Sequence, residues 1–159
     1  NAVLIGGTNE PEIRQMVYIT KDAPVELRFI ELMPIGECAH WPRERFLENS
    51  AVLEAVPELE PCGTSGVARL FSLPNARGRV GLISPLSSHF CPECNRIRIT
   101  PDGRLKPCLH SAQEIELRGF HGAELDAKLR EGICAKPMRH HLSPASPSES
   151  LRGMSLIGG

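Results

Sequence analysis

The chain has few aromatic residues and no surplus of positive charge. Aromatic residues make up 4% of its 159 residues, and 18 basic residues face 19 acidic ones, for a net charge of −1. Few rings are therefore present to stack on nucleobases, and a broad nucleic-acid surface needs an excess of lysine and arginine. The composition argues against a nucleic-acid-binding protein and indicates that any anion site is local.

The sequence also lacks an apolar run long enough to cross a bilayer, and its first residues resemble no secretory signal. We therefore expect no membrane span and a cytoplasmic location. With 41% hydrophobic and 23% charged residues, the chain has the composition of a globular protein. In a reducing compartment its six cysteines are expected to act as ligands or catalytic groups before they form disulfides.

Residues 1–40 have the pattern of a strand, a helix and a second strand. Residues 2–5 form an apolar run typical of a buried parallel strand, residues 9–18 carry apolar side chains at helical spacing, and residues 25–33 form a second apolar run. This order implies a parallel sheet or barrel. Because the chain starts within the first strand and without methionine, we expect it to be a piece of a longer protein.

Residues 41–142 change in character and predict an α+β domain. A short helix is expected after Ser50, and two strands at residues 67–71 and 80–83 flank a turn-rich stretch, which is typical of an antiparallel hairpin. Residues 123–135 predict a further helix. Residues 143–159, which begin with a stretch rich in serine and proline and end in Gly-Gly, are expected to be a mobile tail.

Three cysteines fall in one segment that contains a strong turn signal. Residues 100–103 read Thr-Pro-Asp-Gly, which favours a hairpin with its loop at residues 101–103. Strand positions whose numbers sum to 204 then face each other, so Arg96 is expected opposite Cys108 and Arg98 opposite Lys106, with Cys94 one step beyond on the same face. On the opposite, apolar face we expect inward packing of Ile97, Ile99 and Leu105.

Thiolates gathered in this way are suited to binding one metal centre. We predict that Cys91, Cys94 and Cys108 bind an iron-sulfur cluster whose fourth coordination position is open to solvent or substrate. The alternative is structural zinc in a non-catalytic interaction module. Its fourth ligand would come from His110, Cys62 or Cys134.

Three arginines are candidate anion ligands. Arg96 and Arg98 accompany the thiolates, and Arg28 lies within the apolar run at residues 25–33, where burial would be costly without an anion. The alternatives are solvated arginines at the hairpin and a salt bridge from Arg28 to Glu26 or Glu31.

The segment Phe-Cys-x2-Cys-Asn-Arg-Ile-Arg-Ile-Thr-x-Asp-Gly-x-Leu-x-x-Cys-Leu at residues 90–109 resembles the C-terminal cluster motif of the GTP 3',8-cyclase family, also called molybdenum cofactor biosynthesis protein A. Residues 28–37, 81–85, 136–141 and 157–159 support the likeness. It implies an α/β fold, with residues 1–40 at the end of an incomplete TIM-like (β/α)6 radical S-adenosylmethionine (SAM) barrel. Residues 41–142 would then form an α+β iron-sulfur cluster domain that binds GTP.

The family's N-terminal C-x3-C-x2-C motif is absent from this sequence. The resemblance therefore implies that a first [4Fe-4S] cluster and most of the S-adenosylmethionine pocket lie in a missing N-terminal part, and that this fragment alone is inactive. The implied lyase converts GTP to (8S)-3',8-cyclo-7,8-dihydroguanosine 5'-triphosphate in molybdopterin synthesis. A 5'-deoxyadenosyl radical removes the 3' hydrogen of GTP, and the sugar radical attacks C8 of guanine.

The resemblance also implies a role for individual residues. Guanine would bind the open iron of a second [4Fe-4S] cluster held by Cys91, Cys94 and Cys108. The other implied contacts are GTP at Arg28, Arg96 and Arg98, the SAM cofactor at Met33, and the active site at the tail residues Gly158 and Gly159. Cyclic pyranopterin monophosphate synthase would act downstream, and a homodimer is left open. Another radical SAM enzyme with an auxiliary cluster is a second alternative.

Overall fold

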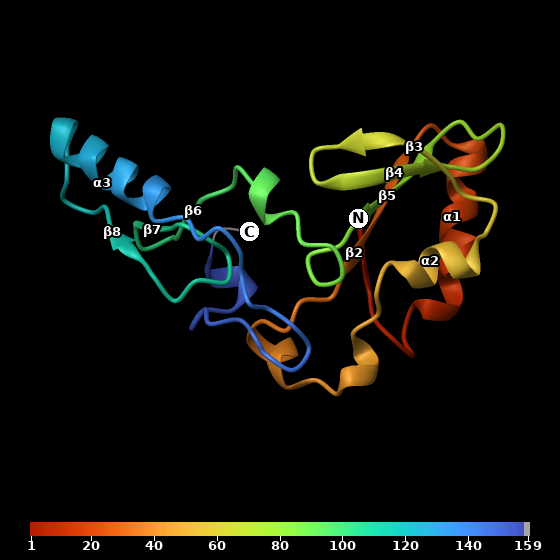
Figure 1. Cartoon of the computed structure of the whole chain (residues 1–159), viewed down its shortest axis with the longest axis horizontal. Helices are drawn as coiled ribbons and strands as arrows, with labels where there is room; N and C mark the ends of the chain where they lie inside the picture. The colour runs from red at the N-terminus through yellow and green to blue at the C-terminus, as the bar shows by residue number, and fades with distance from the viewer. Residues whose placement is uncertain (158–159) are drawn as a thin grey trace. The chain divides into compact units, whose positions relative to one another are not determined.

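The computed structural model describes residues 1–157, which fold into two compact units (Figure 1). The first comprises residues 1–32 and 42–90, and the second comprises residues 33–41 and those from 91 onward. Both contain helices and strands, so the fold is mixed α/β. None of the helices in the described residues has the length and apolar character needed to traverse a membrane.

A five-stranded mixed sheet forms the centre of the first unit. Its strands, in spatial order, are β1 (Ala2–Leu4), β2 (Glu26–Glu31), β5 (Arg79–Ile83), β4 (Ala68–Ser72) and β3 (Glu60–Ser65). β1, β2 and β5 run parallel, and β4 and β3 continue the sheet in antiparallel pairs. The predicted parallel strands and the predicted hairpin are both confirmed, and they belong to one sheet because β5 pairs with β2.

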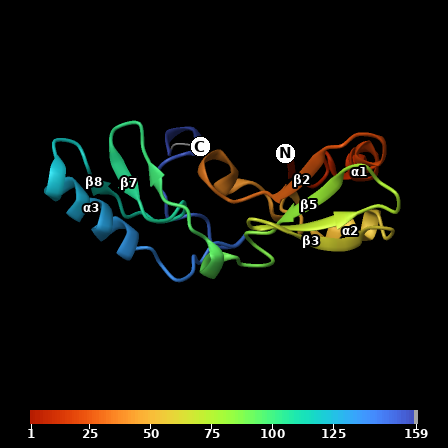
Figure 2. The ribbon, with the colours of Figure 1, turned by 90° about the horizontal axis from the view of Figure 1, so that it is seen from above.

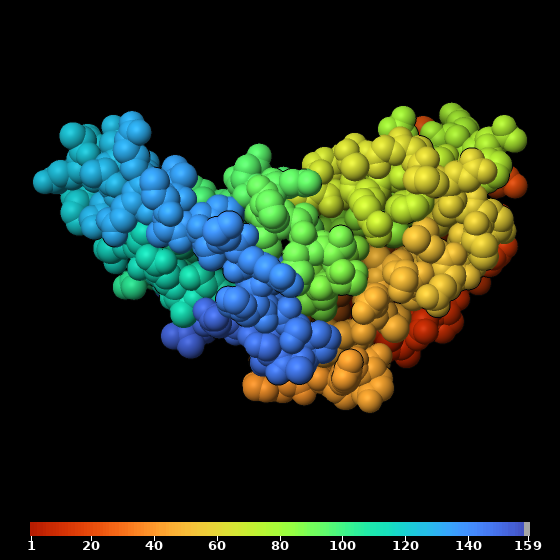
Figure 3. Space-filling view, viewed as in Figure 1, coloured from red at the N-terminus to blue at the C-terminus, as the bar shows by residue number. Residues whose placement is uncertain are grey.

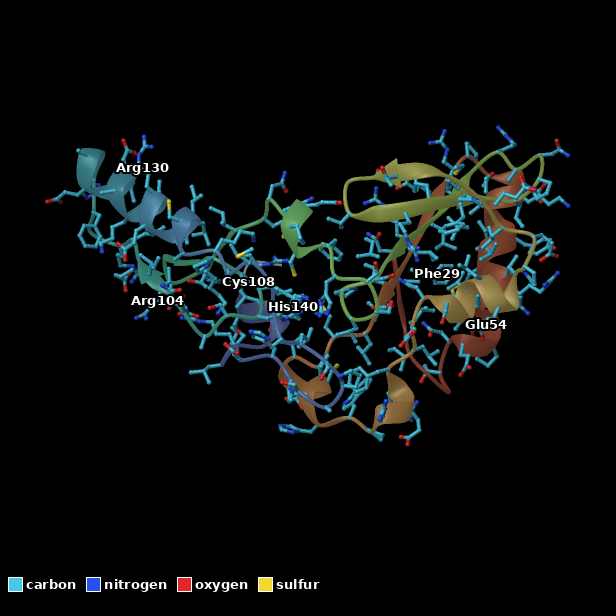
Figure 4. The ribbon with its side chains drawn as sticks, in the orientation of Figure 1. Phe29, Glu54, Arg104, Cys108, Arg130 and His140 are labelled. Carbon is cyan, nitrogen blue, oxygen red and sulfur yellow. The ribbon has the colours of Figure 1, made fainter. Side chains whose placement is uncertain are left out.

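Two helices complete the core of the first unit. They are α1 (Ile13–Asp22), preceded by a 3-10 turn at Glu10–Glu12, and α2 (Ser50–Ala55), preceded by a 3-10 turn at Arg43–Arg45. Apolar side chains of both helices pack with Phe29 and Val80 of the sheet, which are fully buried. Phe29, labelled in Figure 4, lies in β2.

The sequence analysis did not predict strand β3. Its sequence, Glu-Pro-Cys-Gly-Thr-Ser, has little β propensity, and most of its residues are exposed. It pairs with β4 through an irregularity between Pro61 and Gly63, as expected of an edge strand. Since β3, β4 and β5 extend the sheet of β1 and β2, strand pairing continues past residue 40, where composition placed a domain boundary. That boundary stays a prediction.

The second unit contains a small antiparallel sheet and one longer helix. The elements are β6 (Arg98–Ile99), β7 (Arg104–Lys106), β8 (Ile115–Glu116) and α3 (Gly122–Cys134), with 3-10 turns at Gly36–His40, Cys91–Glu93 and Met154–Leu156. The strand order is β6-β7-β8. Helix α3 contacts β7 and β8, as Figure 2 shows, and Figure 3 shows it on the surface of this unit.

The predicted hairpin register is confirmed. Arg98 pairs with Lys106 and Ile99 with Leu105, and the Gly103 amide donates to the carbonyl of Thr100 at 2.9 Å. Gly103 has a φ of +80°, which a residue with a side chain adopts at a cost. The turn residues therefore set the alignment of the strands.

The prediction that the whole apolar face of the hairpin packs inward is wrong for two of its three residues. Leu105 is fully buried, but Ile97 is 36% exposed and Ile99 48% exposed. Leu105 lies against Gly132 of α3, where a side chain would overlap it. Because α3 packs on β7 and β8, the strand that carries Ile99 is at the uncovered edge of the sheet.

Candidate metal centre

The first two cysteines of the predicted site lie at the two ends of one tight turn. Cys91 begins the 3-10 turn Cys91–Glu93, and the Cys94 amide donates to the Cys91 carbonyl at 3.1 Å. Pro92 favours such a turn because its ring fixes φ near the helical value. Both cysteines are half-buried. The sequence Cys-Pro-Glu-Cys thus holds two thiols on a rigid, short backbone segment.

The third cysteine follows β7 after one intervening residue, Pro107. Cys108 is half-buried, and its carbonyl accepts from the Ser111 amide at 3.3 Å. Cys108 and His140, both labelled in Figure 4, line one cavity of about 240 Å³ in the second unit. Its lining also includes His110, Arg139, His141 and Glu149. One predicted ligand therefore borders a concave polar space.

A lysine that the sequence analysis passed over lies between the two arms of the cysteine segment. The ammonium nitrogen of Lys136 is 3.6 Å from Cys94 Sγ, 2.7 Å from the Arg96 carbonyl oxygen and 3.3 Å from that of Pro107. Pro107 directly precedes Cys108. One cation thus contacts the thiol of Cys94 and the backbone next to Cys108.

The predicted pairing of Arg96 with Cys108 is wrong as a strand pairing, because the ladder ends at Arg98 and Lys106. Pro107 has no amide hydrogen to donate. Lys136 instead bridges the carbonyls of Arg96 and Pro107 beyond the ladder. The side chain of Arg96 is exposed, whereas Arg98 is half-buried.

His140 lies beside Cys91, and His110 packs against His140. A ring nitrogen of His140 is within 4.8 Å of Cys91 Sγ. The imidazole also accepts a hydrogen bond from the backbone, because the Leu142 amide donates to His140 Nδ1 at 3.2 Å. His110 packs edge-on against His140, with 4.9 Å between ring centroids, and its Nδ1 lies 3.3 Å from Ser148 Oγ. Burial, helped by the charge of neighbouring groups, lowers the pKa of His110 to about 4. His110 is therefore neutral at physiological pH.

Arg28 forms a salt bridge with Glu26, which the sequence analysis gave as an alternative to a bound anion. Its Nε donates to Glu26 Oε1 at 2.6 Å, and Nη2 donates to Ser65 Oγ at 3.2 Å. The side chain is 36% exposed, so its burial requires no bound anion. Arg28 belongs to the first unit, whereas Arg96 and Arg98 belong to the second.

The other predicted residues are placed as follows. Met33 is half-buried at the start of the second unit. Cys62 lies in β3 and Cys134 at the end of α3, both exposed, and burial together with Glu37 raises the pKa of Cys38. Gly158 and Gly159 lie outside the described residues.

The C-terminal segment is joined to the hairpin by a charged cluster. Arg152 donates to both carboxylate oxygens of Asp102, at 2.9 and 2.7 Å, and to both of Glu114, at 2.7 and 2.8 Å. Lys106, fully buried, donates to the Ser111 carbonyl at 2.6 Å and pairs with Glu114 at 3.4 Å. The sequence analysis missed this cluster because Arg152 is 50 residues from Asp102.

The donor set fits an iron-sulfur cluster. All six cysteines, each within the described residues, are free thiols, and three of them, all half-buried, occur within residues 91–108. Thiolates are the ligands that such clusters require, and the ammonium group of Lys136 lies 3.6 Å from one of these sulfurs. Zinc uses the same donors, so the donor set alone does not select between the two metals.

Comparison with known proteins identifies the family. Residues 25–142 match the family described as Molybdenum Cofactor Synthesis C. The whole chain is 47% identical to the GTP 3',8-cyclase of Alkaliphilus oremlandii, 49% identical to that of Alkaliphilus metalliredigens and 38% identical to that of Clostridium botulinum strain Hall, and in each case it covers 51% of the relative. The chain spans about half the length of these relatives. It therefore belongs to the Molybdenum Cofactor Synthesis C family, and throughout its length it is similar to part of the GTP 3',8-cyclases.

Proposed function

We propose that this chain is the C-terminal part of a GTP 3',8-cyclase and that its second unit binds a [4Fe-4S] cluster through Cys91, Cys94 and Cys108. The observation that carries the proposal is the presence of three half-buried, free thiols in one segment, with the ammonium group of Lys136 in contact with Cys94. The relatives that match the whole chain carry the name of that enzyme.

When bound, such a cluster supplies an iron with an open position that can hold the guanine base of GTP. The chain's own residues would hold the rest of the nucleotide. Arg98 is half-buried on β6, and Arg96 is exposed next to it, so both can direct guanidinium groups to a triphosphate. The family resemblance assigns Arg28 to GTP as well, and a phosphate would then replace its present partner Glu26. Fixing both ends of the nucleotide serves a reaction that depends on positioning.

The remaining assignments follow from the family resemblance. Residues 1–40 would be the end of an incomplete (β/α)6 barrel, and the parallel pairing of β1 with β2 is compatible with that role. Met33 would contact S-adenosylmethionine, and Gly158 and Gly159 would reach the active site. The product would be (8S)-3',8-cyclo-7,8-dihydroguanosine 5'-triphosphate, which cyclic pyranopterin monophosphate synthase would consume. Homodimerisation is left open.

Metal analysis of the full-length protein that contains this sequence tests the proposal. After anaerobic reconstitution with iron and sulfide, we expect both elements to be retained in equal amounts, and we expect GTP to perturb the spectrum of the cluster. Stoichiometric zinc without acid-labile sulfide would favour the zinc-binding interaction module. A cluster whose spectrum GTP leaves unchanged would favour another radical enzyme with an auxiliary cluster.

A further inference from the structure

Lys136 places its ammonium group among three acceptors of the cysteine segment. The nitrogen is 2.7 Å from the Arg96 carbonyl oxygen, 3.3 Å from the Pro107 carbonyl oxygen and 3.6 Å from Cys94 Sγ. A lysine ammonium has three hydrogens to donate, so these contacts can use all of them. The side chain is half-buried. Immobilising so flexible a side chain has an entropic cost, which the three contacts offset.

The two carbonyl contacts explain how the segment keeps its shape. The β6–β7 ladder ends at Arg98 and Lys106, and Pro107 has no amide hydrogen with which to extend it. Lys136, which follows α3 (Gly122–Cys134), crosses this gap and holds the two arms of the segment together. These contacts bring the backbone next to Cys108 to the same nitrogen as the thiol of Cys94.

The sulfur contact has a different consequence. A hydrogen bond or a positive charge at a ligand thiolate withdraws electron density from the sulfur and stabilises the reduced, more negative state of a cluster. It also leaves the iron a better electron acceptor. Lysine is suited to this role because its charge is compact and strongly localised.

We propose that Lys136 is a positioning residue of the metal centre. It donates to the Cys94 thiolate, raises the reduction potential of the cluster and clamps the two arms that carry its ligands. This inference rests on the proposed function, because it requires a cluster at Cys91, Cys94 and Cys108. Lys136 lies 42 positions from Cys94 in the sequence, so only folding brings the two side chains together.

The experiment compares Lys136→Met with Lys128→Met in the full-length protein. Methionine has a similar length but neither charge nor hydrogens to donate. Lys128 is the matched control because it lies on α3 and pairs with Glu131 at 2.8 Å. Lys128→Met therefore removes the same charge but no contact with a cysteine sulfur. Two quantities are measured: the reduction potential of the cluster, followed by electron paramagnetic resonance, and the rate of iron loss to a chelator.

For Lys136→Met we expect the reduction potential of one cluster to become more negative. We also expect iron to be lost from that site to the chelator about 10- to 100-fold faster. Lys128→Met should match the unaltered protein in both measurements. Faster iron loss with an unchanged potential would overturn the proposal, since it would leave Lys136 as a backbone clamp alone. An unchanged result in both measurements would overturn it as well.

Three further outcomes are informative. If Lys136→Met is folded by circular dichroism but takes up no second cluster, the clamp is supported, and Lys136→Gln, which keeps hydrogens to donate but no charge, is used for the potential. The same variant is used if Lys136→Met does not fold, and a potential equal to that of the unaltered protein would then overturn the proposal. If the unaltered protein itself retains no iron and sulfide, the proposed function fails rather than the role of Lys136.

Discussion

At the scale of single residues, two lysines of the second unit hold their ammonium groups against an acidic side chain, backbone carbonyls or a sulfur. Lys106 is fully buried yet bonded to Glu114 and the Ser111 carbonyl, and Lys136 is bonded to two carbonyls and a sulfur. Such partners are what make a buried or half-buried cation tolerable. Sequence patterns identify these lysines only as strand or turn residues, because their partners come from other segments.

Arg96 and Arg98 provide a prediction at this scale. Under the proposed function, Arg98→Ala in the full-length protein should weaken GTP binding about 10- to 100-fold, because hydrogen bonds to a charged group contribute about 1.5–3 kcal/mol. Arg96→Ala should act in the same direction, since only its backbone carbonyl is engaged by Lys136. The measurement is calorimetry under anaerobic conditions.

The control for this prediction is Arg130→Ala. Arg130, labelled in Figure 4, is exposed on α3 and outside the cysteine segment. Its removal should leave GTP affinity unchanged. If Arg96→Ala and Arg98→Ala behave like Arg130→Ala, the assignment of these arginines to the nucleotide is wrong.

Gly132 provides a second residue-scale prediction. A methyl group at this position would overlap Cδ2 of Leu105 and lie 3.0 Å from its Cδ1, and Leu105 is fully buried. Overpacking costs about 1–3 kcal/mol, against up to roughly 1 kcal/mol gained by replacing a helical glycine with alanine. We expect Gly132→Ala to lower the free energy of unfolding by about 1 kcal/mol or more.

Urea unfolding measures this effect, and a double-mutant cycle identifies its cause. Leu105→Ala alone should destabilise by about 2–5 kcal/mol because it leaves a cavity. Combined with Gly132→Ala, the loss should be smaller than the sum, since the new methyl group then has room. Additive losses would mean that the helix and the strand do not meet as described.

At the scale of elements, local signals and long-range contacts were predicted with unequal success. The turn at residues 100–103 depends on four adjacent residues, so its register followed from the sequence. The exposure of Ile97 and Ile99 depends on where α3 packs, which no pattern within the hairpin reveals. Edge strand β3 was missed because its proline and glycine are read as turn signals.

The C-terminal segment yields a prediction about pH. Hydrogen bonds from Arg152 hold the pKa values of Asp102 and Glu114 below their usual range. A carboxyl group with a lowered folded pKa contributes stability above its unfolded pKa and loses it as pH falls toward the folded value. We therefore expect residues 143–157 to be protected at neutral pH and to lose protection progressively below about pH 4.

Hydrogen exchange of residues 143–157, with rates corrected for pH, measures this protection. Arg152→Gln should reduce it at neutral pH and flatten its dependence on acid, because the cation that lowers both pKa values is gone. Arg118→Gln is the control, since Arg118 is exposed and makes none of these ion pairs. Equal acid dependence in the two variants would exclude Arg152 as the anchor.

At the scale of the whole molecule, the sequence indicated the fold class and the family, while the arrangement around the metal centre required the structure. The three cysteines were identifiable because they lie within 18 residues of one another. Lys136, His140 and Arg152 were not, because they come from distant segments that only folding brings to the hairpin. The comparison adds that the whole chain is similar to about half of each cyclase.

The proposed second cluster leads to a prediction about the metal content of the full-length protein. Under the proposed function, a longer protein binds one [4Fe-4S] cluster outside this chain and a second within it, so the full-length protein should hold about eight irons, four at each site. Replacing Cys91, Cys94 and Cys108 with serine should then remove about half of the iron and leave the first cluster in place. Serine is close to cysteine in size but lacks the thiolate that such a cluster requires, so the loss reports ligation rather than packing.

The chain carries its own matched control for this experiment. Cys38, Cys62 and Cys134 are also free thiols, and two of them are more exposed than the predicted ligands. Replacing these three with serine removes the same number of sulfurs and should leave the iron content unchanged. Equal loss of iron in both triple variants would show that iron binds thiols without selection. Loss of iron in the control variant alone would show that Cys91, Cys94 and Cys108 are not the ligands. Half-loss confined to the Cys91, Cys94 and Cys108 variant is the result that ligation by this segment requires.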